Sequence, residues 1–458
     1  MALTPPQRYF SRAVTAALAD TMCFVAAAWI SWNLVAPPFS PLVYGAATVV
    51  GALGCFAALY YADAYGLKAL SSGRDAFHSV IVVMGMAFLL AVVVHHFGWF
   101  PSGAAEAMAK TAALYFPFLL IERLGFRLVS SLAPFTERLV IVGASDLGIA
   151  SARFAIECRR LGTELVGFLS DDIAHERTFI EGVPVLGRVH QLEKIVDDFD
   201  IDRIVVASKD REGHFPAAEL LNQKLRGVTV ESGISFYERI SGRVYIRDLR
   251  PSYLIFSEGF RVSRAASWVK RAIDISISAA GLLLTSPLLL LCAIAIRLDS
   301  PGSVFFSQER VGFGGKPFSI WKLRSMLDDA EAESGPVWAQ TDDLRVTRVG
   351  KFLRMTRMDE VPQLWNVLKG EMSLVGPRPE RPEFVDSLCV RYPYFSLRDS
   401  LKPGVTGWAQ IQLGYVNEVE EFEEKLALDI YYMKYRSTIM DLLILWKTAK
   451  TMLLMSGV

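Results

Sequence analysis

Four long apolar stretches within the first 130 residues constrain the fold of this chain more than any other feature. Each is close to the ~20 residues that an α-helix needs to cross the hydrocarbon core of a bilayer. Charged side chains are nearly absent from them: Asp20 and the adjacent Glu122 and Arg123 intrude, and Lys110 and Arg127 lie close to the ends of the fourth. Pro37 and Pro38, rather than a small-residue cleavage site, follow the first stretch, which argues against a removable signal peptide. We therefore expect membrane spans at residues 13–35, 42–61, 79–97 and 108–128.

The positive charges that flank these stretches predict their orientation, because loops rich in Lys and Arg stay on the cytoplasmic side. Basic residues precede the first stretch, lie between the second and third, and follow the fourth, whereas segments 37–41 and 98–105 contain no Lys or Arg. Both ends of the helical bundle, and everything after Arg138, should therefore face the cytoplasm. The flanking residues are Arg8, Arg12, Lys68, Arg74, Arg123, Arg127 and Arg138.

The composition of the whole chain excludes several classes of protein. Of its 458 residues, 52% are hydrophobic and 21% are charged, which is too apolar for an ordinary soluble enzyme. Lys and Arg together number 48, as do Asp and Glu, so no overall basic field is available and we expect no nucleic-acid partner. The five cysteines are scattered without Cys-x-x-Cys spacing, which indicates neither a disulfide framework nor a zinc site.

After residue 133 short β-rich runs alternate with helical patterns, which is typical of βαβ units. The turn at 143–148 resembles a dinucleotide-binding turn, but Ser145 stands where a second glycine would let the backbone approach a pyrophosphate. One interpretation is a bound nucleotide whose ribose contacts Asp171 and Asp172. The other, which Ser145 favours, is a Rossmann-like domain that kept the fold and lost the ligand. The expected strands are 139–142, 165–169 and 203–207, with helices near 147–161 and 190–199.

A further apolar run, at 275–296, is long enough to cross a membrane, yet cations flank both of its ends. Ser286 and Pro287 lie in its middle. Pro287 lacks the backbone N–H of a regular helix, and the Ser286 hydroxyl can satisfy the carbonyl that this leaves unpaired, so a sharp bend is tolerated there. We predict a re-entrant helical hairpin that dips into the inner leaflet; the alternative is an ordinary kinked span. The flanking cations are Lys270, Arg271 and Arg297.

The polar C-terminal part holds the residues best suited to chemistry. Asp359 is a good helix N-cap, so Asp359 and Glu360 are expected at the N-terminus of a helix that Gly370 ends. A carboxylate can attack phosphorus only where cations cancel the repulsion between anions, and Arg354 and Arg378 could supply bidentate contacts to phosphate. The simpler interpretation is a capping carboxylate and a solvated arginine surface. The combination with a bent membrane helix favours catalysis.

Several motifs in this region closely resemble those of the bacterial polyprenyl-phosphate sugar-1-phosphate transferases, the monotopic phosphoglycosyl transferases that start exopolysaccharide, capsule or O-antigen assembly. The motifs cover the chain from Trp268 to the C-terminus, and the helices and Rossmann-like domain before them resemble the large members of that family. They are Lys270-Arg271-x-x-Asp274, Ser286-Pro287, Lys322-Leu-Arg324-Ser-Met, Arg354-x-Thr-Arg-Met-Asp359-Glu360-Val-Pro-Gln-Leu-Trp-Asn, Gly376-Pro-Arg378-Pro-Glu and Lys402-Pro-Gly-Val-Thr-Gly-Trp408.

The resemblance implies a chemistry for these residues. Asp359 would attack the β-phosphate of a UDP-sugar, UDP-glucose or UDP-galactose, and release UMP; undecaprenyl phosphate would then take the sugar phosphate from the carboxylate. Glu360 would assist, and the two carboxylates would hold the expected cofactor, Mg²⁺. Ser286 and Pro287 would form the re-entrant break. The residues implied in substrate or phosphate binding are Arg354, Arg378, Lys322, Arg324 and Asp429.

The expected architecture is a membrane protein in three parts: a four-helix transmembrane bundle at 1–132, a cytoplasmic α/β Rossmann-like domain at 133–260, and a mainly α monotopic catalytic domain with a re-entrant helix at 261–458. It should lie in the bacterial cytoplasmic (inner) membrane with its catalytic domain on the cytoplasmic face. The expected partners are a UDP-sugar, undecaprenyl phosphate of the inner leaflet, membrane lipids and a second copy in a homodimer.

Two other functions stay open at this point. A membrane-anchored NAD-dependent sugar-nucleotide epimerase or dehydratase could combine spans with a Rossmann domain, but the chain lacks the Tyr-x-x-x-Lys pair of such enzymes and its glycine turn is imperfect. A non-enzymatic scaffold that recruits polysaccharide enzymes is the third possibility.

Overall fold

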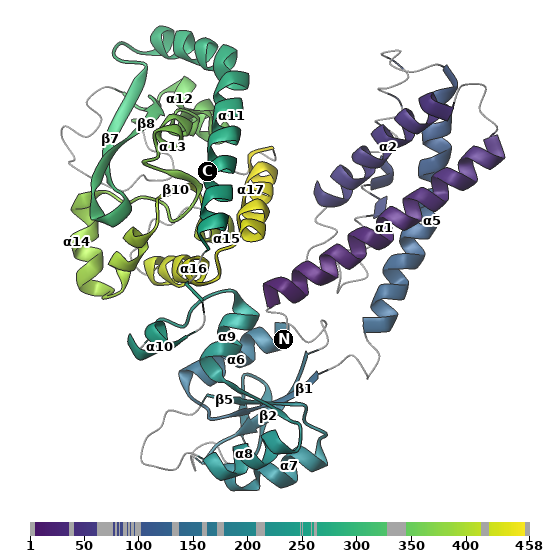
Figure 1. Cartoon of the computed structure of the whole chain (residues 1–458), viewed down its shortest axis with the longest axis vertical. Helices are drawn as coiled ribbons and strands as arrows, with labels where there is room; N and C mark the ends of the chain where they lie inside the picture. Colours follow the sequence, from purple (N-terminus) through teal and green to yellow (C-terminus); the bar gives the residue numbers. More distant parts are fainter. Residues whose placement is uncertain are drawn as a thin grey trace. The chain divides into compact units, whose positions relative to one another are not determined.

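The structure, a computed structural model, is mostly helical with a sheet region, and it divides into two compact units, Met1–Gly242 and Arg243–Val458 (Figure 1). The described residues are 5–35, 41–61, 77, 80–81, 83–85, 89, 92, 96, 102–130, 137–157, 163–171, 178–207, 216–247, 249, 251–257, 259–260, 263–327, 345–413 and 421–453.

Three long helices in the first unit coincide with three of the four expected spans. They are α1 (Pro5–Val35), α2 (Pro41–Tyr61) and α5 (Ser102–Ser130). The ring of Phe24 packs edge-on against Tyr115 at 5.3 Å, and buried Arg123 donates a 2.8 Å hydrogen bond to buried Asp20, so the charges that intrude into the apolar stretches pair across α1 and α5. The expected span at 79–97 lies almost wholly outside the described residues, and four spans stay a prediction.

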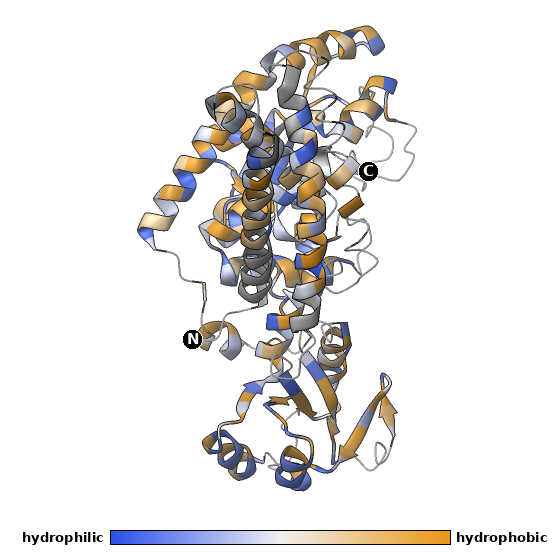
Figure 2. Cartoon of the chain, turned by 90° about the vertical axis from the view of Figure 1, so that its right-hand side faces the viewer, coloured by the Kyte–Doolittle hydropathy of each residue, from blue (hydrophilic) through white to orange (hydrophobic). Residues whose placement is uncertain are grey.

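A six-stranded sheet follows in the same unit, with the order β3-β4-β2-β1-β5-β6. All neighbours pair in parallel except β3, which is antiparallel to β4 at one edge. The expected strands coincide with β1, β2 and β5, and Figure 2 shows apolar strands beside more polar helices. The elements are β1 (Glu137–Val142), α6 (Asp146–Glu157), β2 (Thr163–Leu169), β3 (Phe179–Ile180), β4 (Val183–Gly187), α7 (Leu192–Asp198), β5 (Arg203–Val206), α8 (Ala217–Leu225), β6 (Thr229–Ser232) and α9 (Gly233–Ser241).

The glycine turn after β1 is closed by protein groups. Ser145 Oγ donates to the carbonyl of Ala207 at 2.5 Å and accepts the amide of Gly148 at 3.3 Å. Asp171 Oδ1 accepts the amide of Val189 at 2.9 Å, while Asp172 lies outside the described residues. Ser145 and Asp171 therefore hold the turn and a loop together, which favours the interpretation of a fold without its ligand.

The second unit is a mainly helical domain with one large core and a smaller hydrophobic cluster that includes Cys292 and Leu353. Its core includes Phe422, Leu426 and Tyr432 of α16, and also Val244 and Leu249, which precede the expected boundary at residue 261. The elements are α10 (Pro251–Phe256), α11 (Arg264–Asp299), β7 (Phe305–Val311), β8 (Pro317–Leu323), α12 (Arg348–Thr356), α13 (Gln363–Lys369), β9 (Ser373–Val375), α14 (Pro382–Arg391), η7 (Phe395–Ser400), β10 (Gly404–Thr406), α15 (Trp408–Leu413), α16 (Glu421–Tyr435) and α17 (Thr438–Leu453).

Helix α11 contains the apolar run with Ser286 and Pro287. Among the described residues it is the one helix long and apolar enough to cross a membrane, with 36 residues and a mean hydropathy of 2.3 over its most apolar window. The helix is continuous through Pro287, and Figure 1 shows that it changes direction toward its C-terminal part. Ser286 Oγ donates to the carbonyl of Leu283 at 2.8 Å, the carbonyl that would pair with an N–H at Pro287. The expected role of Ser286 in satisfying a freed carbonyl is confirmed.

Candidate active site

The Asp359–Glu360 pair lies in a 3₁₀ turn, Met358–Glu360, between α12 and α13. The expected helix start at Asp359 is wrong: α13 begins at Gln363, and Pro362 is its N-cap. A left-handed Arg357, with φ of 56°, ends α12 and turns the chain so that both carboxylates point inward, each only 7% exposed. Burial of two adjacent acids is costly, so nearby cations are required.

Three cations surround Glu360. Lys322 Nζ and Arg378 Nη2 both approach its Oε1, at 3.1 and 3.0 Å, and Arg357 Nη1 lies 3.7 Å from Oε2. Burial acts to raise the pKa of Glu360, but Arg378, Lys322 and Arg357 outweigh it and hold that pKa well below its usual range. Glu360 is therefore ionised at neutral pH, and the three cationic side chains are between 20% and 24% exposed.

Asp359 behaves differently from its neighbour. Burial and the charge of Glu360 raise the pKa of Asp359 to about 6, against the opposing effect of Lys322, Arg354 and Arg378. The carboxylate is thus mostly ionised at pH 7, yet it is poorly solvated. A desolvated carboxylate beside cations is suited to nucleophilic attack on an anionic phosphate.

The loop that carries Arg378 is fixed by its backbone. Strand β9 pairs in parallel with β10, and beyond the strand the amide of Gly404 donates to the carbonyl of Pro377 at 2.9 Å. A Cβ on Gly376 would lie 2.4 Å from the carbonyl oxygen of Lys402, so the close approach requires glycine. Arg354, in the last turn of α12, donates from Nε to Ser325 Oγ at 3.0 Å.

Two predicted site residues have other partners. Arg324 is buried and donates to the carbonyls of Ser300 and Pro301, both at 2.7 Å, at the end of α11. Lys322 and Arg324 have the two-residue spacing that predicts one strand face, but they do not share a face because β8 ends at Leu323 and the side-chain alternation ends with it. Asp429 is 2% exposed and accepts Arg398 Nε at 2.8 Å. These contacts favour structural roles for Arg324 and Asp429.

The first turns of α11 hold the elements on both sides of the site. Arg271 donates to the carbonyls of Val367 and Leu368 at 2.7 and 2.9 Å, at the C-terminus of α13. Asp274 accepts Ser373 Oγ at 2.8 Å and the amide of Leu374 at 3.1 Å, on β9. From the sequence, Arg271 was identified as a flanking cation, and both residues as part of a family motif, without a predicted contact. Their spacing of three shows that they share a helix face, but it does not show what that face contacts.

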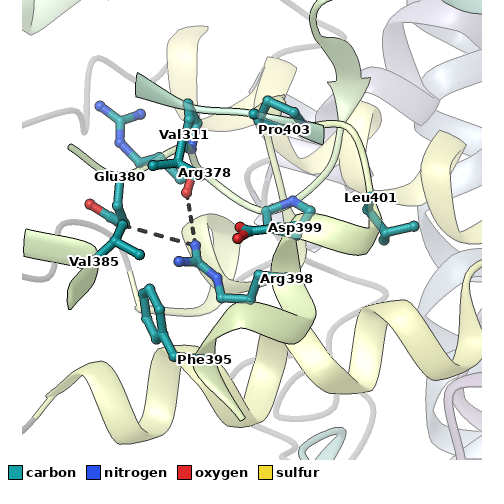
Figure 3. Close-up of a pocket in the computed structure, with 12 residues that line it drawn as sticks. Val311, Arg378, Glu380, Val385, Phe395, Arg398, Asp399, Leu401 and Pro403 are labelled. Carbon is teal, nitrogen blue, oxygen red and sulfur yellow. Dashed lines mark hydrogen bonds and ion pairs between the residues drawn. The ribbon is translucent and has the colours of Figure 1, made fainter. Parts of the chain in front are cut away.

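A pocket of about 290 Å³, partly open to solvent, adjoins the Arg378 loop. Figure 3 shows Arg398 on its wall, with contacts that run to Arg378 and Glu380. Burial opposes the ionisation of Glu380, but Lys425 and Arg398 lower its pKa to about 2. Arg398, Lys425 and Glu380 were not predicted as functional, because Arg398 and Lys425 lie in none of the motifs and Glu380 only ends the motif that contains Arg378.

The carboxylate pair fits one mode of magnesium binding. No cluster of three or more His, Cys, Asp or Glu side chains suited to a metal is present among the residues that the structure describes. Magnesium, however, is commonly held by one or two carboxylates together with substrate phosphates. Asp359 and Glu360 are the two carboxylates that would hold the ion, and a cation would relieve their mutual repulsion, which raises the pKa of Asp359.

Residues 265–455 match the family model described as bacterial sugar transferase. The chain is 43% identical over 216 residues to UDP-N-acetylgalactosamine-undecaprenyl-phosphate N-acetylgalactosaminephosphotransferase of Aeromonas hydrophila, covering 47% of this chain and 50% of that one. It is 45% identical to UDP-glucose:undecaprenyl-phosphate glucose-1-phosphate transferase of Caulobacter vibrioides, covering 40% of this chain and 69% of that one. It is 42% identical to the Escherichia coli enzyme of the same name, with 39% of each chain covered.

The chain therefore belongs to the bacterial sugar transferase family, a membrane-associated family of enzymes, and the resemblance found in the sequence is confirmed. The matched segment spans about half the length of the Aeromonas relative. Residues 265–455, the part of the chain that matches the family model, include the carboxylate pair and its cations.

Proposed function

We propose that this protein transfers a sugar-1-phosphate from a UDP-sugar to undecaprenyl phosphate, releases UMP, and so initiates a bacterial surface polysaccharide. The observation that carries the proposal is a buried Asp359 with a pKa near 6 beside a cation-bound Glu360. The names of the relatives, which include UDP-glucose and UDP-N-acetylgalactosamine donors, support this class of donor. We propose UDP-glucose or UDP-galactose as the sugar donor.

The proposed reaction has two displacements at one phosphorus. In the first, a carboxylate oxygen of Asp359 bonds to the β-phosphorus of the donor, the bond to the bridging oxygen breaks, and UMP leaves with the electron pair. In the second, a phosphate oxygen of undecaprenyl phosphate attacks the same phosphorus and the Asp359 oxygen leaves. Lys322, Arg354 and Arg378 neutralise the phosphate oxygens, and this positioning of charge is the main catalytic contribution.

Asp359 and Glu360 are the proposed ligands of Mg²⁺. When bound together with the donor phosphates, the ion supplies further neutralisation of their negative charge. Glu360, held ionised by Lys322 and Arg378, keeps this end of the site anionic and maintains the orientation of both cations.

We also propose the re-entrant arrangement of α11, which would place the site at the headgroups of the inner leaflet. Support comes from contacts at both ends of the helix within one compact unit. The N-terminal part binds α13 and β9 through Arg271 and Asp274, and in the C-terminal part Cys292 and Ile296 pack with Leu323 and Leu353. Exposed leucines lie between these ends, with Leu283 75% and Leu284 79% exposed, as expected of a lipid-facing surface.

For the rest of the chain we propose the same domains, location and oligomeric state that the sequence predicts. This architecture comprises four spans at 1–132, a cytoplasmic Rossmann-like domain at 133–260 and a catalytic domain at 261–458, in the bacterial inner membrane and as a homodimer. The parallel sheet with β1 between β2 and β5 supports the middle part of this proposal.

Cysteine labelling tests the topology of α11. In a chain whose five native cysteines are replaced by serine, Ser303→Cys, just beyond the end of α11, should not react with a membrane-impermeant maleimide in intact cells and should react after permeabilisation. Leu283→Cys should also resist labelling from outside. The matched control is Ser102→Cys, which the charge pattern places outside. Labelling of Ser303→Cys in intact cells to the level of the control would mean that α11 crosses the membrane.

The pH dependence of the first displacement follows from the pKa of Asp359. Because its pKa is about 6 and only the ionised form attacks, kcat/KM for the UDP-sugar should be constant near pH 8 and fall below about pH 6, approaching tenfold per pH unit. In the proposed two-step scheme, kcat/KM for the UDP-sugar depends only on the first displacement. The titration of the phosphate of undecaprenyl phosphate, which falls in the same pH range, therefore does not affect it. The measurement is initial UMP release against pH; a profile that stays flat to pH 5 would contradict a nucleophile with this pKa.

The experiment that tests the function uses the purified full chain in detergent with magnesium, undecaprenyl phosphate and a panel of UDP-hexoses. We expect UMP, a lipid-linked sugar diphosphate and parallel double-reciprocal lines, because a covalent intermediate separates the two substrates. Absence of UMP with every donor would contradict the proposal and favour the scaffold. Sugar conversion that depends on NAD would favour the epimerase or dehydratase.

A further inference from the structure

Four charged side chains are buried together next to the site, outside the carboxylate pair. Arg398 and Asp429 are 5% and 2% exposed, and Lys425 and Glu380 are 8% and 9% exposed. Arg398 comes from η7, Lys425 and Asp429 lie one turn apart on α16, and Glu380 follows the loop that carries Arg378. The charges balance, with two cations and two anions. Burying four charges is rarely the most stable solution, which indicates that the cluster serves geometry.

Arg398 joins the other members of the cluster to the Arg378 loop. Its Nε donates to Asp429 Oδ2 at 2.8 Å, and its Nη2 donates to the backbone carbonyl of Arg378 at 2.8 Å (Figure 3). The same Nη2 lies 3.9 Å from Glu380 Oε1, and the guanidinium carbon stands 4.7 Å above the ring of Phe395. One planar group is thus fixed from four sides.

Arg378 is contacted by Arg398 through its backbone carbonyl, and its own side chain reaches the carboxylate pair. Arg378 Nη2 donates to Glu360 Oε1 at 3.0 Å. Lys425 pairs with Glu380, two residues further along the same loop, so the loop is held at two points by cations from η7 and α16. A shift of this backbone would move the Arg378 guanidinium away from Glu360.

We propose that Arg398, oriented by Asp429, is a positioning residue that fixes the backbone of Arg378 and thereby holds its guanidinium at the phosphate-binding end of the site. The expected effect on catalysis rests on the proposed function, whereas the fixing of the loop backbone does not. The inference also replaces the expected role of Asp429 in substrate binding. An arginine is required because its rigid fork makes two hydrogen bonds in fixed directions, which a lysine cannot reproduce.

The first test separates positioning from folding. With UDP-sugar and no lipid acceptor, the proposed first step gives one burst of UMP per active site. For Arg398→Lys we expect the burst rate at saturating donor to fall about 10- to 100-fold, since small displacements of catalytic groups have effects of this size, with an unchanged amplitude. Asp429→Asn should act in the same direction. A lower amplitude at the wild-type rate would mean only fewer folded molecules, and would overturn the proposal.

The second test asks whether Arg398 acts through Arg378. In the Arg378→Ala background, adding Arg398→Lys should lower the burst rate by less than about threefold, because the group that it positions is already absent. If the loss in burst rate of the double variant equals the product of the losses of the two single variants, the proposal is overturned. The control is Arg247→Ala, which removes an exposed ion pair with Glu423 in the same unit and should leave the burst unchanged.

A third measurement does not depend on activity, so it distinguishes failure of this inference from failure of the proposed function. Hydrogen exchange of peptides covering residues 375–381 should be faster in Arg398→Lys than in the wild type, while exchange across β7 and β8 stays the same. Equal exchange at 375–381 would overturn the positioning role even if the enzyme is active. If Arg398→Lys does not fold, the paired variant Arg398→Gln with Asp429→Asn, which removes both charges, serves for the same comparison.

Discussion

Asp359→Asn is expected to abolish UMP release, with a loss on the order of 10⁴-fold or more, as for removal of other covalent nucleophiles. The amide has nearly the same shape as the carboxylate but carries no charge and no nucleophilic oxygen. The neighbouring Glu360 cannot replace it, because Lys322 and Arg378 both contact its Oε1 and hold its pKa low. The measurement is the UMP burst, with mass spectrometry of trapped wild-type enzyme to locate the sugar phosphate on Asp359.

The control for this prediction is Asp386→Asn, which changes an exposed carboxylate on α14 in the same unit and should keep full activity. Thermal unfolding of both variants checks the fold. Retention of more than about 1% of the wild-type burst rate by Asp359→Asn, or a sugar phosphate adduct on another residue, would remove Asp359 as the nucleophile.

Arg378→Ala should give the second largest loss, about 10²- to 10³-fold in kcat/KM for the UDP-sugar, the range found when one group that stabilises a developing anion is removed. Its guanidinium is the closest charged contact of Glu360, at 3.0 Å, and it also counteracts the raised pKa of Asp359. Its loss should therefore weaken phosphate binding and also move the acidic limb of the pH profile to higher pH. Arg378→Lys should recover part of the activity, because the charge is kept and the fork is lost.

The matched control is Arg391→Ala, an exposed arginine at the end of α14. A loss below about tenfold in Arg378→Ala would argue against a phosphate-binding role, since a charge-assisted contact in a partly buried site contributes more than that. If Arg391→Ala lowers kcat/KM for the UDP-sugar as much as Arg378→Ala does, the effect comes from surface charge in general.

Several parts of this protein could be predicted from local sequence because their physics is local. A proline within an apolar helix leaves one carbonyl unpaired four residues earlier, and the adjacent serine can reach it; Ser286 and Leu283 show this contact. The Asp359–Glu360 pair was found because two acids stand next to a run of cations. The alternation of strand and helix after residue 137 follows from hydrophobic periodicity, and three of the expected strands match β1, β2 and β5.

The exact helix start could not be predicted, since capping preferences are weak compared with tertiary contacts. Asp359 has the features of an N-cap, yet it lies in a 3₁₀ turn, where the three cations around Glu360 compensate the burial of the pair. Likewise Lys322 and Arg324 have the spacing of one strand face, but the strand ends between them, and Arg324 binds the end of α11 instead.

The sequence alone determined the apolar segments, their flanking charges and the chemical types available to the site, because these depend on residues that are close along the chain. Only the tertiary structure decided which cations reach which acid: Arg378 contacts Glu360 from 18 residues away, and Arg398 contacts Asp429 from 31 residues away. Ion pairs require atoms within a few ångströms of each other, and that proximity is set by the packing of β9, η7 and α16, which no local pattern records.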